Sequence, residues 1–223
     1  MFAIIHNLLN ANDLTAVNTI LSTSKFVDGR LSAGQSAINS KHNLELSASN
    51  EIINNLNSIV MNRLVQHPDY RAICWPKKLA APIYSRYEPS MFYGVHTDDP
   101  VMGDNELYRS DISMTIFLSS PEDYLGGELT IIETGGERPF KLAAGAVLFY
   151  PSSSQHYVAP VSEGIRQVAI TWLQSSIRDP EKRKILFDLY RSRETLLKEC
   201  PKSKACEGVS ASFNNLVRMW VEI

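Results

Sequence analysis

Two histidines and one aspartate stand at positions from which a β-scaffold could bring them together. His96 and Asp98 are separated by one residue at the end of an expected strand, where residues i and i+2 point the same way. His156 stands alone much later, at the start of another expected strand. Two imidazoles and one carboxylate form the facial set of ligands that holds non-haem Fe(II) and leaves coordination positions open. The spacing therefore predicts a metal site of this kind.

Arg166 begins the next expected strand, where it shares a face with Val168, Ile170 and Trp172. A charged residue at the head of an apolar face needs a partner. The planar guanidinium matches a carboxylate through two hydrogen bonds and stays charged in apolar surroundings. In a β-sandwich, strands carrying His156 and Arg166 would face each other about 10 Å apart. A five-carbon diacid that chelates a metal at one end could then reach Arg166 with the other.

The elements that must position these residues are short strands. Eight runs of β-branched and aromatic residues alternate with turn signals, and no helical pattern interrupts them. The expected strands cover residues 80–87, 91–97, 110–118, 128–133, 139–142, 146–150, 156–160 and 166–174. A series of this kind favours a sandwich or jelly roll over a parallel α/β sheet.

Helices are expected on both sides of the strands. They cover residues 13–22, residues 49–66 and a segment that begins at Asp179-Pro180. Asp13 is the expected cap of the first helix. Between the first two helices, residues 25–46 have the polar, glycine-containing composition of a long loop. Residues 213–223 are expected to form a terminal packing segment. We expect an N-terminal helical support region, a jelly-roll core and a C-terminal helical extension; they span residues 1–70, 71–176 and 177–223.

Composition excludes several classes of function. Among 223 residues, 22 Lys and Arg stand against 24 Asp and Glu, which gives a formal net charge of −2. This balance provides no electrostatic reason to expect a nucleic-acid or membrane-surface partner. No apolar run is long enough to span a bilayer, and the N-terminus lacks the pattern of a signal peptide. Three cysteines are too few for a disulfide framework. A soluble cytoplasmic protein is expected.

Four short segments match the motifs of a known family. They read YGVHTD at 93–98, RSDIS at 109–113, YLGGEL at 124–129 and YPSSSQH at 150–156. The chain resembles the bacterial PKHD-type hydroxylases, which are Fe(II)- and 2-oxoglutarate-dependent dioxygenases related to prolyl 4-hydroxylase. The resemblance is dense between about residues 79 and 190, and it implies a mainly β fold with flanking helices around a double-stranded β-helix (jelly-roll) core.

The resemblance also implies a chemistry. The iron ligands would be His96, Asp98 and His156. Arg166 would bind the distal carboxylate of 2-oxoglutarate, the cosubstrate that reacts with O₂ and is decarboxylated to succinate while a C–H bond is hydroxylated. Asp98 argues for hydroxylation, because halogenating relatives lack the carboxylate ligand. Ascorbate is the expected reductant.

Two further residues are implied to line the cosubstrate pocket. Tyr87 stands where relatives carry a tyrosine whose hydroxyl helps to bind 2-oxoglutarate, and Trp172 would lie beside Arg166. An ordinary strand tyrosine and a core tryptophan are the alternative interpretations. Some relatives use a second tyrosine at the position of Phe117, which lacks the hydroxyl. That contact is therefore absent or comes from elsewhere.

The expected class of prime substrate rests on the family relationship alone. Relatedness to prolyl and lysyl hydroxylases makes a protein or peptide side chain the expected substrate, ahead of a free amino acid or small metabolite, and a homodimer is compatible with it. Two other classes of function use the same residues: a non-catalytic jelly-roll module that senses a small acid, and a zinc-dependent hydrolase. A binding module has no need of the full triad plus Arg166. Release of succinate and loading with Fe(II) or Zn(II) distinguish the three.

Overall fold

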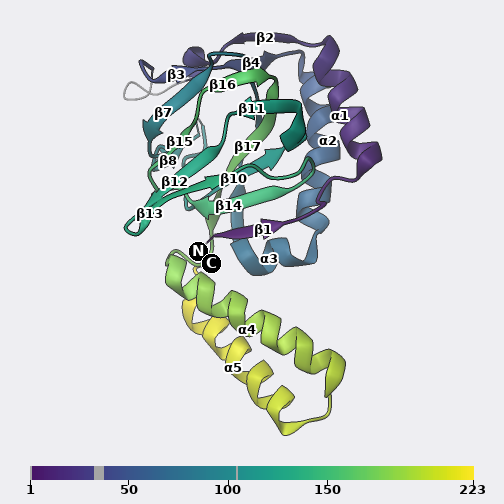
Figure 1. Ribbon diagram of the computed structural model, residues 1–223. Helices are drawn as coiled ribbons and strands as arrows, with labels where there is room; N and C mark the ends of the chain where they lie inside the picture. Colours follow the sequence, from purple (N-terminus) through teal and green to yellow (C-terminus); the bar gives the residue numbers. More distant parts are fainter. Residues whose placement is uncertain (1, 33–37, 104) are drawn as a thin grey trace.

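The computed structural model describes residues 2–32, 38–103 and 105–223. Two antiparallel sheets pack face to face (Figure 1). The larger sheet contains, in order, β1 (Ala3–Ile5), β14 (Val147–Pro151), β10 (Ile112–Phe117), β17 (Arg166–Ser175), β6 (Ile83–Tyr87), β4 (Leu44–Ser47) and β2 (Lys25–Asp28), with β5 (Pro76–Leu79) also beside β17. The smaller sheet contains β13 (Gly136–Phe140), β12 (Leu129–Glu133), β15 (His156–Val158), β7 (Phe92–His96) and β3 (Lys41–His42). This is the expected jelly-roll core.

Two ribbons and two short 3₁₀ turns complete the β region. The ribbons pair β11 (Tyr124–Gly126) with β16 (Val161–Gly164), and β8 (Val101–Met102) with β9 (Tyr108–Arg109). The turns are η1 (Gly29–Ser32) and η2 (Pro121–Asp123). Each of the eight predicted strands corresponds to an observed strand, with shifted ends. The strands of these ribbons, together with β1, are too short to give a periodic signal, and the sequence did not predict them as separate strands.

The larger sheet is buried on both faces. The outer face of β10 carries Met114 and Ile116, which pack in one core cluster with Val17 of α1 (Ala11–Thr23) and Leu56 of α2 (Asn50–Gln66). Figure 1 shows both helices lying along that side of the sandwich. The inner face of β10 looks toward the smaller sheet. Because both faces of β10 are covered, its polar residues Ser113 and Thr115 are buried as well as its apolar ones.

The N-terminal helices differ from expectation in the cap of the first helix and in the presence of an additional helix after the second. Asn10, not Asp13, caps α1: Asn10 Oδ1 accepts from the Asp13 amide and Asp13 Oδ2 from the Asn10 amide, each at 3.0 Å. The prediction was wrong because both residue types are good caps, and this reciprocal box uses both. The predicted second helix is confirmed with Ser49 as its cap. Pro68 then starts another helix, α3 (Pro68–Cys74).

The expectation of a long loop over residues 25–46 was wrong. This stretch contains β2, η1, β3 and the start of β4, while residues 33–37 within it lie outside the described residues. The strands are short and lie near or at sheet edges, and several of their polar side chains line a cavity rather than the core. They therefore lack the apolar alternation by which a strand is recognised.

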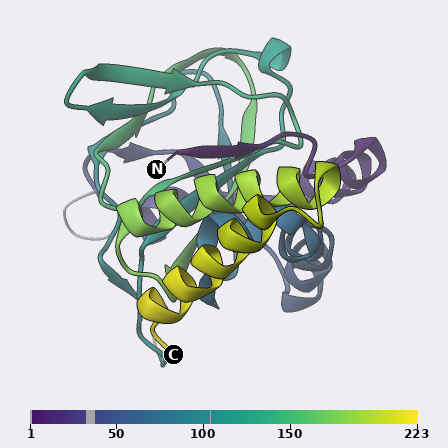
Figure 2. The ribbon, with the colours of Figure 1, turned by 90° about the horizontal axis from the view of Figure 1, so that it is seen from below.

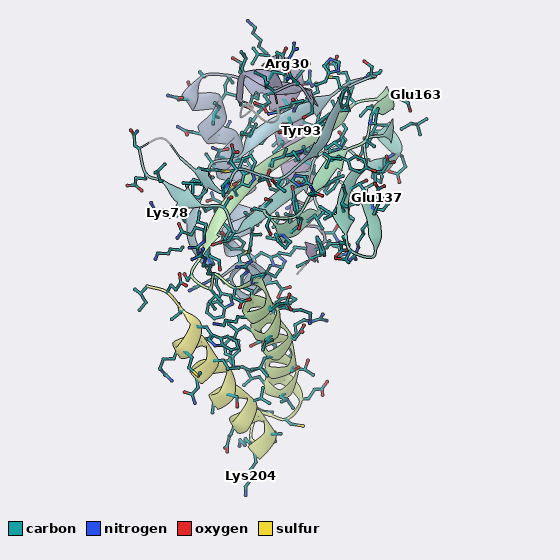
Figure 3. All side chains as sticks on the ribbon, turned by 90° about the vertical axis from the view of Figure 1, so that its left-hand side faces the viewer. Arg30, Lys78, Tyr93, Glu137, Glu163 and Lys204 are labelled. Atoms are coloured by element: carbon teal, nitrogen blue, oxygen red, sulfur yellow. The ribbon has the colours of Figure 1, made fainter. Side chains whose placement is uncertain are left out.

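A pair of helices projects from one end of the sandwich (Figures 1 and 2). α4 (Pro180–Glu199) starts as predicted, with Asp179 as its cap, and α5 (Lys204–Trp220) is a full helix where only a terminal packing segment was expected. Ile177, Leu186 and Phe213 form their small core. Figure 3 shows Lys204 at the far tip of this pair and Tyr93 in the sandwich at the other end of the molecule. The division into three regions stays a prediction.

Within the described part of the chain, no helix is long and apolar enough to cross a membrane.

Candidate iron and cosubstrate site

The three predicted metal ligands converge at one point. β7 and β15 are neighbours in the smaller sheet, and His96 and His156 are cross-strand partners. Asp98 follows β7 and places its Oδ1 3.9 Å from His96 Nε2 and 3.8 Å from His156 Nε2. The candidate ligand atoms all lie within 4.8 Å of one another. A divalent cation with bonds of about 2.0–2.2 Å fits between them.

Backbone carbonyls orient both histidines. His96 Nδ1 lies 2.8 Å from the Gly94 carbonyl and His156 Nδ1 lies 2.9 Å from that of Ser154. Because a carbonyl only accepts, each Nδ1 carries the proton and each Nε2 keeps its lone pair free for a metal. Burial, with His156 nearby, lowers the pKa of His96 to about 4. His96 is thus neutral at physiological pH, the form that binds metals.

Arg166 lies at the opposite end of the same cavity, on β17 of the larger sheet. Its side chain is 1% exposed, and its guanidinium carbon lies 4.9 Å from the Tyr87 ring centroid and 5.9 Å from that of Phe117. No acidic group among the described residues pairs with it, and its Nε and Nη1 atoms have no hydrogen-bond partner there. A buried cation without a counter-ion is costly. The arrangement therefore suits an anionic ligand.

Hydroxyl groups surround this arginine. Tyr87 is its cross-strand partner, and the Tyr87 hydroxyl is buried without a hydrogen-bond partner in the described structure. Burial raises the pKa of Tyr87 to about 12, so the hydroxyl stays protonated and can donate to a carboxylate. Trp172 lines the same cavity, and its Nε1 is likewise unpartnered. The structure brings both predicted residues to the pocket; their contacts with a cosubstrate stay predictions.

Tyr124 was missed by sequence reasoning. Its hydroxyl is buried and unpartnered within the described chain, and burial raises the pKa of Tyr124 while neighbouring Arg166 opposes the shift. Gly127, with φ +68°, makes room there: a Cβ on it would lie 3.0 Å from Arg166 Cδ and 3.1 Å from Tyr124 Cε2. Tyr124 is thus a second hydroxyl beside Arg166, whereas Phe117 provides none. The YLGGEL segment was the available signal.

One cavity of about 770 Å³ connects the metal ligands with Arg166. Its lining also contains a buried ion pair that the sequence did not predict: Lys41 Nζ lies 2.6 Å from Glu45 Oε1, with side chains 8% and 11% exposed. Lys41 also contacts Ser32 Oγ at 2.9 Å and lies 5.5 Å from the Tyr93 ring centroid. Tyr93 in turn stacks on His96 with ring centroids 3.7 Å apart. The cavity therefore has a charged wall beyond the metal ligands.

Comparison with known proteins identifies the family and the fold. Residues 82–174 match the family model of the 2OG-Fe(II) oxygenase superfamily. The crystal structure of a prolyl-4-hydroxylase from Pseudomonas putida shares the fold, with a TM-score of 0.55 and 16% identity over 78% of this chain and 92% of that one.

Two curated relatives are similar over the whole length of both chains. A PKHD-type hydroxylase of a Synechococcus species is 39% identical over 224 residues, and one of Synechococcus elongatus is 40% identical over 223 residues, each with 100% of both chains covered. The family implies Fe(II) and 2-oxoglutarate, and the convergent His96, Asp98 and His156 ligands with the unpaired Arg166 fit both. The chain therefore belongs to the PKHD-type hydroxylases and is a 2-oxoglutarate-dependent dioxygenase.

Proposed function

We propose that the protein hydroxylates an unactivated C–H bond of a prolyl- or lysyl-type side chain in a protein or peptide, with decarboxylation of 2-oxoglutarate to succinate. The observation that carries this proposal is the single cavity with the three metal ligands at one end and the unpaired Arg166 at the other. When bound, Fe(II) supplies the activation of O₂. The surrounding side chains bind the cosubstrate and contact the substrate.

The chain binds the cosubstrate from two sides. Arg166 takes the distal carboxylate through its planar fork, and the Tyr87 hydroxyl donates a further hydrogen bond to it. Three protein ligands leave coordination positions for the keto-acid end. Binding would thus give hydrogen-bond partners to Arg166 and Tyr87 atoms that have none within the described parts of the chain.

The remaining cavity wall suits a polar side chain that enters from a peptide. Leu31 and Val101 line the cavity yet are 81% and 55% exposed, so they form an apolar contact surface at its mouth. The Glu45 carboxylate in the cavity wall is already paired with the Lys41 ammonium, whereas Asp99 places an exposed acidic side chain in the lining. The acidic Asp99 side chain favours a positively charged lysyl-type group over an uncharged one.

The test begins with the full chain loaded anaerobically with Fe(II). After air is admitted, succinate release from 2-oxoglutarate is measured first, and then bacterial lysate supplied with 2-oxoglutarate is incubated in air with wild type or with His156→Ala. Mass spectrometry should find peptides heavier by one oxygen atom with wild type only. Binding of 2-oxoglutarate without release of succinate would instead identify a sensor. Hydrolytic activity of the protein loaded with Zn(II) alone would identify a hydrolase.

We also propose ascorbate as the reductant that keeps the iron in the Fe(II) state. The number of turnovers per enzyme should rise when ascorbate is added during prolonged incubation with 2-oxoglutarate. An equal number of turnovers with and without ascorbate would contradict this part of the proposal.

A further inference from the structure

The two carboxylate oxygens of Asp98 face different partners. Oδ1 faces the Nε2 atoms of His96 and His156, as described above. Oδ2 accepts a hydrogen bond from Ser113 Oγ, and Ser113 Oγ lies 2.8 Å from Ser152 Oγ. We propose that Ser113 and Ser152 form a positioning relay that keeps Asp98 a one-oxygen metal ligand.

Hydrogen-bond chemistry gives the relay one direction. An ionised carboxylate only accepts, so the single proton of the Ser113 hydroxyl goes to Asp98. Ser113 then has only lone pairs to offer Ser152, and the Ser152 hydroxyl must donate to Ser113. The donated bond from Ser152 polarises the Ser113 hydroxyl and strengthens its bond to Asp98. The relay therefore acts on one oxygen of one metal ligand.

The relay also crosses the sandwich. Ser113 lies on β10 and Ser152 directly follows β14, both in the larger sheet, whereas Asp98 follows β7 of the smaller sheet. Ser113 is the cross-strand partner of Tyr150, and Ser152 lies two residues beyond Tyr150, in the turn that follows β14. Two neighbouring strands thus present their hydroxyls to a ligand that belongs to the opposite sheet.

Both serine hydroxyls are buried, so each needs a hydrogen-bond partner within the protein. Ser113 is 0% exposed and Ser152 is 2% exposed. A hydroxyl in such a place is costly unless it is hydrogen-bonded, and an apolar residue would otherwise serve the core better. Ser113 belongs to the RSDIS segment and Ser152 to the YPSSSQH segment, and the family resemblance assigned no role to either serine. Their position against Asp98 provides one.

The consequence concerns the number of open coordination positions. Carboxylates bind metals through one oxygen or through both. If Oδ2 were free, Asp98 could turn and occupy a position that the keto acid or O₂ needs. Held by Ser113, Oδ2 stays away from the metal and Oδ1 alone binds. The relay therefore protects cosubstrate binding and helps to orient the ligand.

The test uses the Co(II)-loaded full chain, whose visible absorption reports coordination number without turnover. Ser113→Ala should change this spectrum, weaken Co(II) binding about ten- to a hundred-fold in competition with a chelating dye, and weaken 2-oxoglutarate binding measured by calorimetry. Ser152→Ala should shift the same readouts in the same direction by less. Ser113→Thr, which keeps the hydroxyl, should restore the spectrum.

Ser119→Ala is the matched control. Ser119 is also a buried serine, but its hydroxyl bonds to the Ile165 carbonyl and the Gln167 amide outside the cavity. This variant should lose stability without any change in the Co(II) spectrum or affinity. If Ser113→Ala does not fold, Ser152→Ala alone decides. Wild-type spectra and Co(II) affinity in the folded variants would overturn the relay, whatever the prime substrate proves to be, because no readout involves turnover.

Discussion

At the iron end of the cavity each ligand side chain has its second polar atom engaged by the protein, whereas at the arginine end several buried polar atoms have no hydrogen-bond partner among the described residues. His96 Nδ1 and His156 Nδ1 are bound to carbonyls, and Asp98 Oδ2 is bound to Ser113. By contrast, Arg166 and Tyr87 keep buried atoms without partners in the described structure. The fold supplies the hydrogen-bond partners at the iron end, whereas the buried polar atoms at the arginine end suit an anionic ligand.

This difference assigns separate tasks to the two ends. Because the Nδ1 atoms of the two histidines and Oδ2 of Asp98 are hydrogen-bonded to the protein, the three opposite atoms already point at one place. This preorganisation lowers the conformational free energy that metal binding must supply. Leaving Arg166 unpaired makes the protein less stable alone and more responsive to an anion. Variants at the two ends should therefore fail in different ways.

The largest effect is expected from removing a metal ligand. His156→Ala leaves two of three ligands, so succinate production should fall to the background and Fe(II) affinity should drop sharply, with the far-ultraviolet circular dichroism unchanged. Asp98→Gly should lose hydroxylation in the same way. Metal content and succinate are the measurements. Wild-type succinate production in either variant would show that the triad is assigned wrongly.

At the arginine end, the effect should fall on 2-oxoglutarate alone. Arg166→Lys keeps the charge but loses the fork, so KM for 2-oxoglutarate should rise roughly ten- to a hundred-fold, which is about 1.5–3 kcal/mol. Arg166→Ala should be worse, while Fe(II) affinity stays near normal in both.

A monoacid provides the internal control for this prediction. 2-Oxobutyrate has no distal carboxylate, so wild type and Arg166→Ala should bind it about equally. An unchanged KM for 2-oxoglutarate in both arginine variants would mean that Arg166 is a structural residue.

The comparison also makes an unusual stability prediction. Because Arg166 is buried without a counter-ion among the described residues, Arg166→Leu should leave the metal-free protein as stable as wild type or more stable by about 1–2 kcal/mol. The same variant should lose the rise in Tm that 2-oxoglutarate gives wild type in the presence of Mn(II). Thermal unfolding with and without ligand measures both.

Arg86 is the contrasting arginine. It donates to the Leu21 carbonyl at 3.1 Å, and its guanidinium carbon lies 3.8 Å from the Phe26 ring centroid. Arg86→Leu should therefore lower stability and preserve the ligand-induced rise. Destabilisation of the metal-free protein by Arg166→Leu, with the ligand response intact, would reverse the roles inferred for the two ends.

Sequence reasoning succeeded where residue type and strand pattern point to the same structure. The jelly-roll strands around His96, His156 and Arg166 are rich in β-branched and aromatic residues, and these polar residues are conspicuous because they interrupt that pattern. The structure places Asp98, Tyr87 and Trp172 at the same cavity. The fold and the convergence of His96, Asp98 and His156 could thus be inferred from local signals.

The remaining features depend on contacts that no local pattern encodes. Lys41 and Glu45 are the polar wall of a cavity, and in the sequence such residues look like a loop. Ser113 acquires its partner only when the larger sheet closes over Asp98. Tyr124 reaches Arg166 from a strand too short to be recognised. In the last two cases the signal lies in the pairing of distant segments.

The smallest expected effect is a pH dependence at the iron end. The folded pKa of His96 is about 4, below its ordinary value of 6.5, because burial disfavours the charged imidazole. Between these values the unfolded chain binds a proton that the folded chain does not, so the free energy of unfolding falls as pH falls. From pH 7.0 to 5.5 the metal-free protein should lose on the order of 1 kcal/mol from this group. Urea unfolding of wild type and His96→Gln at both pH values isolates it, since only wild type carries the titrating ring. Parallel pH dependence in the two proteins would mean that His96 does not carry this shift, and that the iron end is less completely formed before metal binding than its hydrogen bonds indicate.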